Sequence, residues 1–110
     1  MGRPTVLLSS RRNHIIGILK YEGDHKLPDL KIDTFPYLVG NSRECAGYLD
    51  CPTISRQHAK ITKAEDVFFI EDLNSANGTK AGGNLLDYKM KVSLEPNEVV
   101  EFADEKFRFI

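Results

Sequence analysis

Ser55, Arg56, His58 and Asn77 are the side chains of this sequence whose types and spacing bear most directly on chemistry. A serine three residues before a histidine supplies the residue types of a nucleophile and its base. The pair has no Gly-x-Ser-x-Gly pattern around it, and it falls where a loop enters an expected strand. We therefore expect no enzymatic activity, no catalytic residue and no cofactor. We interpret His58 as a structural histidine that fixes the loop of Ser55 through hydrogen bonds.

The two cysteines raise the question of a metal site. Cys45, Cys51 and His58 carry ligand types that zinc accepts, but their spacing matches no common zinc pattern and a fourth ligand is missing. Two cysteines are also fewer than a small secreted domain stabilised by disulfides carries. We therefore expect no metal, and two reduced, structural cysteines in an intracellular protein.

The overall composition argues against several classes of partner. The chain has 110 residues, of which 41% are hydrophobic and 28% charged, and its formal net charge is −1. Such a balance, with no run of like charge, offers no basic stripe for nucleic acid and no basic surface for a membrane. The first residues do not resemble a signal peptide, and no apolar run approaches the length of a membrane span. We expect protein partners, and neither direct nucleic-acid binding nor membrane binding.

Helical periodicity is nearly absent, so strands must position the polar loops. The sequence shows these strands as short apolar or alternating runs. In the run 57–62 we place Ala59 and Ile61 on one face, and His58 and Lys60 on the other. The runs separated by turn residues predict an all-β sandwich or barrel. We expect strands at residues 14–21, 35–39, 57–62, 67–70, 99–102 and 107–110.

Turn residues between these runs support the same architecture. Asn77-Gly78 and Gly82-Gly83-Asn84 are typical of tight turns, because glycine and asparagine tolerate positive φ. The length is that of one domain, and the sequence contains no repeat, linker or low-complexity stretch. The last residues are apolar and strand-like, so we expect residues 1–110 to be a single domain cut from a longer multidomain protein.

Three polar segments, in this order, resemble the forkhead-associated (FHA) family: Gly40-Asn41, Ser55–Ala59 and Asp72–Thr79. The family pattern is roughly Gly-Arg, then Ser-Arg-x-His-Ala, then Asp-Leu-x-Ser-x-Asn-Gly-Thr. Each block is weak alone, but the three together are specific, and the likeness runs from about Leu38 to the carboxyl terminus. The resemblance implies an FHA-type β-sandwich of two antiparallel sheets, with about 10–11 short strands, that binds other proteins.

The resemblance also implies roles for individual residues. A phosphothreonine carries close to two negative charges and three acceptor oxygens. In the family, an arginine after the first glycine grips the phosphate, the serine donates its hydroxyl to it, and the asparagine of Asn-Gly holds the peptide main chain. These roles fall on Asn41, Ser55 and Asn77, with Arg56 beside the phosphate. The structural positions of the motif are Gly40, His58, Gly78 and Thr79.

Position 41 departs from the family pattern, because it holds asparagine where arginine is expected. Arginine offers a permanent charge and a planar fork of five donors, and Asn41 offers a neutral amide on a shorter stem. Two neighbouring pocket positions also lack the family's groups, since Gln57 replaces a frequent lysine and Ala76 replaces a frequent hydroxyl residue. We therefore expect an intact fold on which phosphothreonine binding is weakened or lost.

The alternative is a working phosphothreonine reader that uses Ser55, Arg56, Asn77 and Arg43. Arg43 lies two residues after the missing arginine, so its side chain is the candidate for supplying the lost charge. The position of Arg43 relative to Ser55 distinguishes the two hypotheses.

Further details resemble the amino-terminal FHA domains of DNA-damage checkpoint mediators. These are the spacing from Gly40 to Cys45, the Pro-Thr-Ile-Ser lead into the serine block, and Phe102-Ala103-Asp104. The likeness implies a nuclear, chromatin-associated parent protein and a domain that associates with itself. We accordingly expect a homodimer, with two-fold symmetry and an isologous interface.

Overall fold

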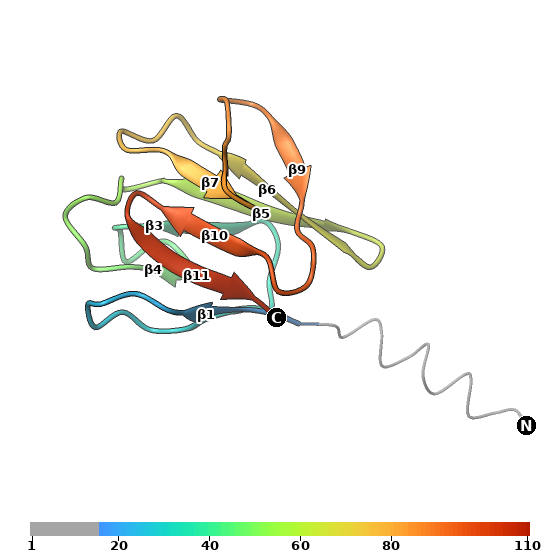
Figure 1. Cartoon of the computed structure of the whole chain (residues 1–110), viewed down its shortest axis with the longest axis horizontal. Coiled ribbons are helices and arrows are strands. Elements are labelled where there is room, and N and C mark those ends of the chain that lie inside the picture. The colour runs from blue at the N-terminus through green and yellow to red at the C-terminus, as the bar shows by residue number, and fades with distance from the viewer. Residues whose placement is uncertain (1–15) are drawn as a thin grey trace, which may run out of the picture.

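The computed structural model describes residues 16–110, in which every regular element is a β-strand. The all-β prediction is therefore confirmed, and within the described range no helix exists that could cross a membrane. Figure 1 shows the strands in chain order. They are β1 Gly17–Tyr21, β2 Leu30–Ile32, β3 Tyr37–Gly40, β4 Gly47–Tyr48, β5 Ala59–Ala64, β6 Val67–Asp72, β7 Thr79–Ala81, β8 Asn84–Leu85, β9 Lys91–Ser93, β10 Val99–Phe102 and β11 Glu105–Phe109.

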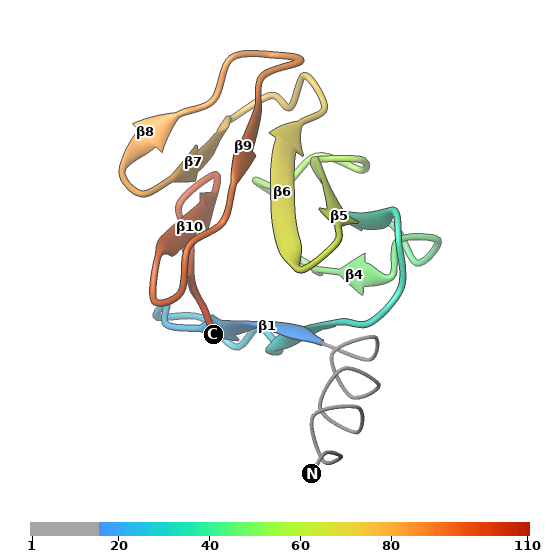
Figure 2. The same cartoon turned by 90° about the vertical axis from the view of Figure 1, so that its right-hand side faces the viewer.

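The strands form two sheets that face each other. One has the order β2-β1-β11-β10-β7-β8 and the other β4-β3-β5-β6-β9. In Figure 2, β10 and β7 lie on one side of the molecule and β6 and β5 on the other. The prediction of two antiparallel sheets is wrong at one pair, because β3 and β4 are parallel. The loop 41–46 brings the chain back beside β3 and turns it again, so that β4 runs in the same direction as β3 with Gly47 opposite Val39, and only a short ladder forms.

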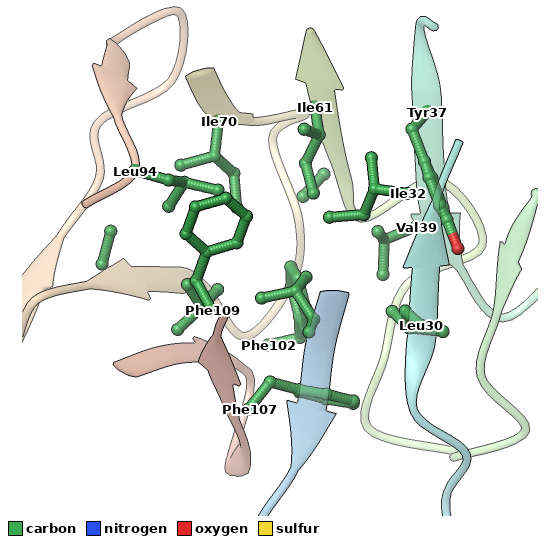
Figure 3. Packing of buried hydrophobic residues seen from close by; sticks show 14 of the residues in the cluster. Leu30, Ile32, Tyr37, Val39, Ile61, Ile70, Leu94, Phe102, Phe107 and Phe109 are labelled. Atoms are coloured by element: carbon green, nitrogen blue, oxygen red, sulfur yellow. The ribbon is translucent and has the colours of Figure 1, made fainter. Parts of the chain in front are cut away.

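The core lies between the sheets and is built from alternate strand residues. In β11, Glu105, Phe107 and Phe109 are buried, while Lys106 is exposed and Arg108 is half-buried. Figure 3 shows Phe109 pointing toward Ile70 of the facing sheet. The period of two in these strands therefore explains which side chains leave water on folding.

The sequence located the long strands better than the short ones. β10 has the bounds that the sequence predicts, but β5 begins at Ala59 and continues to Ala64, two residues beyond the predicted run. The first residues of the run 14–21, His14 and Ile15, lie outside the described residues. The strands β2, β4, β8 and β9 have two or three residues each and were not predicted, because so few residues show no periodicity.

The prediction that His58 lies on the face opposite Ala59 and Ile61 is wrong. His58 is fully buried, as are both of those residues. It precedes the first residue of β5, so the alternation of that strand does not apply to it. Its ring instead packs edge-on against Phe102, with 5.8 Å between the ring centroids.

Most of the polar loops lie at one end of the sandwich, which we call the loop end. Figure 1 shows the carboxyl terminus beside the start of β1, at the opposite end. The antiparallel bonds between Ile18 and Ile110 fix that second end. The connections gathered at the loop end are 22–29, 41–46, 49–58, 73–78, 86–90 and 103–104.

Candidate functional site

Gly40 ends β3 where the backbone of the segment before β5 passes close to it. A β carbon at Gly40 would overlap the carbonyl oxygen of Arg56. The next residue continues the contact, because the N–H of Asn41 donates to the carbonyl oxygen of Ser55 at 2.9 Å. Only glycine at position 40 allows this approach, which brings the first and second motif blocks together.

The side chain of Asn41 is engaged with the same segment. Its amide Nδ2 donates to the carbonyl oxygen of Cys51 at 2.9 Å, and the residue is half-buried. Burying a backbone carbonyl without a donor is costly, so this bond stabilises the path of the loop 49–58. Asn41 therefore holds a loop in place and contributes no positive charge to the site.

The ring of His58 joins two loops. Its Nδ1 accepts a hydrogen bond from the N–H of Ser55 at 3.0 Å, so Nε2 carries the proton and donates to the carbonyl oxygen of Gly78 at 2.8 Å. Burial lowers the pKa of His58, although the Gly78 bond and the charge of Asp72 oppose that shift. A neutral imidazole is the form that satisfies both bonds, so His58 ties the loop of Ser55 to that of Gly78.

The loop 73–78 is organised around the carboxylate of Asp72. The hydroxyls of Ser75 and Thr79 each donate to Oδ1 at 2.6 Å, and the N–H of Ser75 donates to Oδ2 at 3.0 Å. The N–H of Gly78 then donates to the Ser75 hydroxyl at 2.9 Å. Burial by itself raises the pKa of Asp72, but these hydrogen bonds lower it below its usual value. The carboxylate is therefore ionised and fixes the shape of the loop.

Asp72 and Ser75 are functional residues of the loop 73–78 to which sequence reasoning gave no role. A signal was available, because an aspartate followed three residues later by a serine is typical of turns in which side chains bond the local backbone. The bond from Thr79 could not be inferred this way, since that residue reaches Asp72 across the whole loop.

Hydrogen bonds join the loop of Ser55 to the loop of Asn77. The N–H of Ala76 donates to Ser55 Oγ at 2.9 Å, which leaves the hydroxyl hydrogen able to donate to a ligand. Asn77 Nδ2 donates to the carbonyl oxygen of Thr53 at 2.7 Å, so Oδ1 stays available as an acceptor. The two side chains thus keep the donor and acceptor that a phosphorylated peptide requires.

The cationic side chains of the motif region lie at the surface. Arg56 is exposed, as is the neutral Gln57 beside it. The guanidinium carbon of Arg43 lies 6.0 Å from the ring centroid of Tyr48, in a cation–π arrangement. The structure therefore gathers Asn41, Ser55 and Ala76 around the loop segment 51–56, while Arg43 packs on an aromatic ring of β4.

Both cysteines are buried and unpaired. The thiol of Cys45 donates to the carbonyl oxygen of Arg56 at 3.2 Å, and that of Cys51 lies 3.3 Å from Thr53 Oγ1. Across residues 16–110, no group of three or more histidine, cysteine or acidic side chains is placed to hold a metal ion. The Cys51 thiol also donates to Glu105 Oε2 at 3.7 Å, so the two thiols contact the loop 49–58 and the start of β11.

Comparison with known proteins adds independent findings. The profile of the FHA domain family matches residues 37–103, more than half of the chain. Among curated proteins, the human proliferation marker protein Ki-67 is 27% identical over 82 residues, which is 74% of this chain. The chain spans only 2% of the length of Ki-67.

Solved structures of FHA domains are similar over most of the chain. The FHA domain of CT664 from Chlamydia trachomatis is 29% identical, with a TM-score of 0.75, over 87% of this chain and 97% of that one. EmbR of Mycobacterium tuberculosis, solved with a low-affinity phosphopeptide, has a TM-score of 0.75 at 20% identity, over 96% of this chain and 28% of EmbR. The MEK1 FHA domain, solved with a phosphothreonine peptide of HOP1, has a TM-score of 0.66 at 22% identity, over 86% of this chain and 94% of that one.

Proposed function

This chain belongs to the FHA domain family, and we propose that it is a protein-interaction module whose grip on phosphothreonine is weak because Asn41 replaces the arginine of the family pattern. FHA domains are phosphopeptide-binding interaction modules, and EmbR and the MEK1 FHA domain were solved with phosphopeptides. The loop end of this chain is the surface on which we place the partner.

The observation that carries the proposal is the bond from Asn41 Nδ2 to the Cys51 carbonyl oxygen. A neutral amide turned to the loop backbone gives a phosphate neither a charge nor a fork of parallel donors. The rest of the scaffold is intact, because Gly40 still admits the loop of Arg56 and His58 still joins its two loops. The arrangement therefore preserves the shape of a peptide site and removes its strongest electrostatic contact.

The size of that loss can be bounded. A micromolar complex has a binding free energy of roughly −8 kcal/mol. Removing one partner of a desolvated charge pair costs about 2 to 5 kcal/mol. A binding free energy of about −3 to −6 kcal/mol would remain, which corresponds to a dissociation constant weaker than about 30 µM.

A titration of the domain with phosphothreonine peptides tests the proposal. We expect dissociation constants weaker than about 30 µM for every peptide of a degenerate phosphothreonine library, measured by fluorescence anisotropy. A peptide that binds at low micromolar concentration and loses its affinity on dephosphorylation would overturn the proposal.

The second candidate function is a working phosphothreonine reader, and the exposure of Arg56 favours it. Arg56 adjoins Ser55, and within residues 16–110 it forms no ion pair, so its charge is available to a phosphate. Arg43 would first have to leave the ring of Tyr48. If tight binding is found, Arg56→Gln and Arg43→Gln identify the source of the charge, with Lys31→Gln on the exposed face of β2 as the control.

We further propose that the domain forms a homodimer and acts in a nuclear, DNA-damage context, as its resemblance to checkpoint mediators implies. The end opposite the loops supports self-association, because Ile16, Ile18 and Ile110 are exposed there, the last of them to 57%. Burying such side chains between two copies is favourable. Sedimentation of the isolated domain is expected to show a dimer, and a monomer at all concentrations would contradict this part of the proposal.

A further inference from the structure

A cavity of about 480 Å³ opens at the loop end, beside the candidate site. It lies among the β1–β2 loop, the segment that follows β4, and the turn between β10 and β11. Its lining combines apolar side chains with carboxylates. The residues that matter here are Leu27, Cys51, Pro52, Asp50, Asp104 and Glu105.

Glu105 is the buried carboxylate of this cavity, with only 3% of its surface exposed. Oε1 accepts a hydrogen bond from the hydroxyl of Tyr21 at 2.6 Å, and Oε2 accepts one from Nδ1 of His25 at 2.8 Å. Burial by itself raises the pKa of Glu105, but the bonds from Tyr21 and His25 lower it below its usual value. An ionised carboxylate therefore lies in the wall of a cavity with largely apolar surroundings.

The other charges of the lining increase this negative character. Asp50 and Asp104 are exposed, and both line the cavity. Lys26 and His25 are the basic side chains of the lining, and the imidazole of His25 is 72% exposed. Three carboxylates thus outnumber the one lysine and one exposed imidazole of the lining, so the potential in the cavity favours a cation.

The cavity and the candidate site share the loop segment 51–55. Cys51, Pro52 and Thr53 line the cavity, and Ser55 follows two residues later. The carbonyl oxygen of Thr53 is the group that holds the amide of Asn77. The segment that lines the cavity therefore also carries Ser55 and holds Asn77, so the cavity and the candidate site are neighbours at the loop end.

We propose that this cavity receives a lysine or arginine side chain of the protein segment that docks on the loop end, a specificity that rests on the proposed interaction function. The aliphatic stem of such a side chain packs on Leu27 and Pro52, and its charged head reaches Asp50, Asp104 and Glu105. The apolar wall suits the aliphatic stem of a long basic side chain, and the carboxylates around it suit the charged head. The domain thereby selects partners with a basic residue near the docked segment.

A small cation tests the cavity without any peptide. Butylguanidinium has the head and most of the stem of arginine, and butylurea is its neutral counterpart. In an NMR titration we expect butylguanidinium to shift the amide signals of Leu27, Cys51 and Asp104, and butylurea to shift them at least about tenfold more weakly. Equal binding of the two compounds, or shifts confined to other parts of the domain, would overturn the proposal.

Variants of the exposed carboxylates make the test specific. Glu105→Gln risks unfolding, because that carboxylate is buried and bonded to Tyr21, so the double variant Asp50→Asn/Asp104→Asn is used. We expect it to weaken butylguanidinium binding about tenfold, while Asp33→Asn at the opposite end leaves binding unchanged. Unaltered binding in the double variant would contradict the assignment.

Peptides then separate this inference from the proposed function. Phosphothreonine peptides with a single lysine at successive positions are compared with the same peptides carrying norleucine, on the wild-type domain and on the double variant. We expect one position at which lysine improves binding, and loss of that advantage in the double variant. If butylguanidinium binds and no peptide does, the docking of a peptide on the loop end fails and the cation site stands. If peptides bind and lysine gives no advantage at any position, the cation specificity fails and the interaction function stands.

Discussion

Asn41 donates a side-chain hydrogen bond to the carbonyl oxygen of Cys51, at the position from which the FHA family pattern would extend an arginine toward a phosphate. The amide therefore has a structural task in the loop 49–58, and this task explains how the loop keeps its path without the guanidinium. An arginine at position 41 would remove that neutral hydrogen bond and add a positive charge to the site.

The variant Asn41→Arg is expected to bind phosphothreonine peptides at least about tenfold more tightly than the wild-type domain, because a charged donor is worth about 2 kcal/mol or more at such a site. It should also lose about 1 kcal/mol of unfolding free energy with the Cys51 bond. Anisotropy titration and urea unfolding measure the two effects.

The matched control is Asn41→Gln, which lengthens the stem without adding charge and should give no gain in affinity. Equal affinities of Asn41→Arg and Asn41→Gln for phosphothreonine peptides would show that charge is not what the site lacks.

The variant Gly40→Ala is expected to lower the free energy of unfolding by about 1–3 kcal/mol, because its β carbon overlaps the carbonyl oxygen of Arg56 and the backbone must move. Urea unfolding measures the loss. The NMR signals of Ser55 and Arg56 should shift as well.

Gly83→Ala is the control for that variant. Gly83 has φ of +83° and no neighbour within 4 Å of its added β carbon, so alanine there should cost about 1 kcal/mol without disturbing Ser55. Unchanged signals of Ser55 in Gly40→Ala would show that the loop adapts without moving the site.

The motif blocks could be located from the sequence because each is local and polar. Gly40 ends β3, and Ser55 and Asn77 lie a few residues before β5 and β7, so their loops could be assigned to the rim of a sandwich. Period-two alternation likewise marked most of β5, and a short apolar run marked β10.

Contacts between distant segments could not be obtained in that way. The bond from Asn41 to Cys51 depends on the path of the loop 49–58, and the burial of His58 depends on Phe102 in the other sheet. The cavity beside Glu105 required three loops from separate parts of the chain to meet. Side-chain patterns within one strand contain none of this information.

His58 is expected to make stability depend on pH near neutrality. Its folded-state pKa is lowered from 6.5, so the unfolded chain binds the proton more readily than the folded domain. The contribution of neutral His58 to the free energy of unfolding is complete above pH 6.5. It is lost as the pH falls from there through the lowered pKa, because a protonated Nδ1 cannot accept the bond from Ser55. Urea midpoints measured from pH 8 to pH 5 should fall on acidification.

The exposed His25 provides the control for this measurement. His25→Asn should keep the fall in urea midpoint between pH 8 and pH 5, because the His58 ring is unaffected. His58→Gln should be less stable at pH 8 and should lose most of the fall. A fall of the same size in His58→Gln as in the wild type would show that His58 is not its source.

Asp72 is expected to make stability depend on pH in a more acidic range than His58 does. Its pKa is lowered from 3.8 by bonds from Ser75 and Thr79, so its contribution is complete above pH 3.8 and is lost as the pH falls through the lowered pKa. At pH 7, Asp72→Asn should lower the unfolding free energy by about 1–3 kcal/mol, because hydrogen bonds to a charged acceptor are replaced by weaker ones. Glu71→Gln, which removes only a long, partly exposed pair with Lys60, should cost less than about 1 kcal/mol.

The difference in urea unfolding free energy between the wild type and Asp72→Asn should therefore narrow below pH 3.8 and be smallest where Asp72 is protonated, since a neutral carboxyl resembles the amide in charge. A difference that stays constant from pH 7 to pH 2 would show that the shape of the side chain, and not its charge, holds the loop 73–78. In that case Ser75→Ala and Thr79→Val, which each remove one donor to Oδ1, should cost as much at pH 2 as at pH 7.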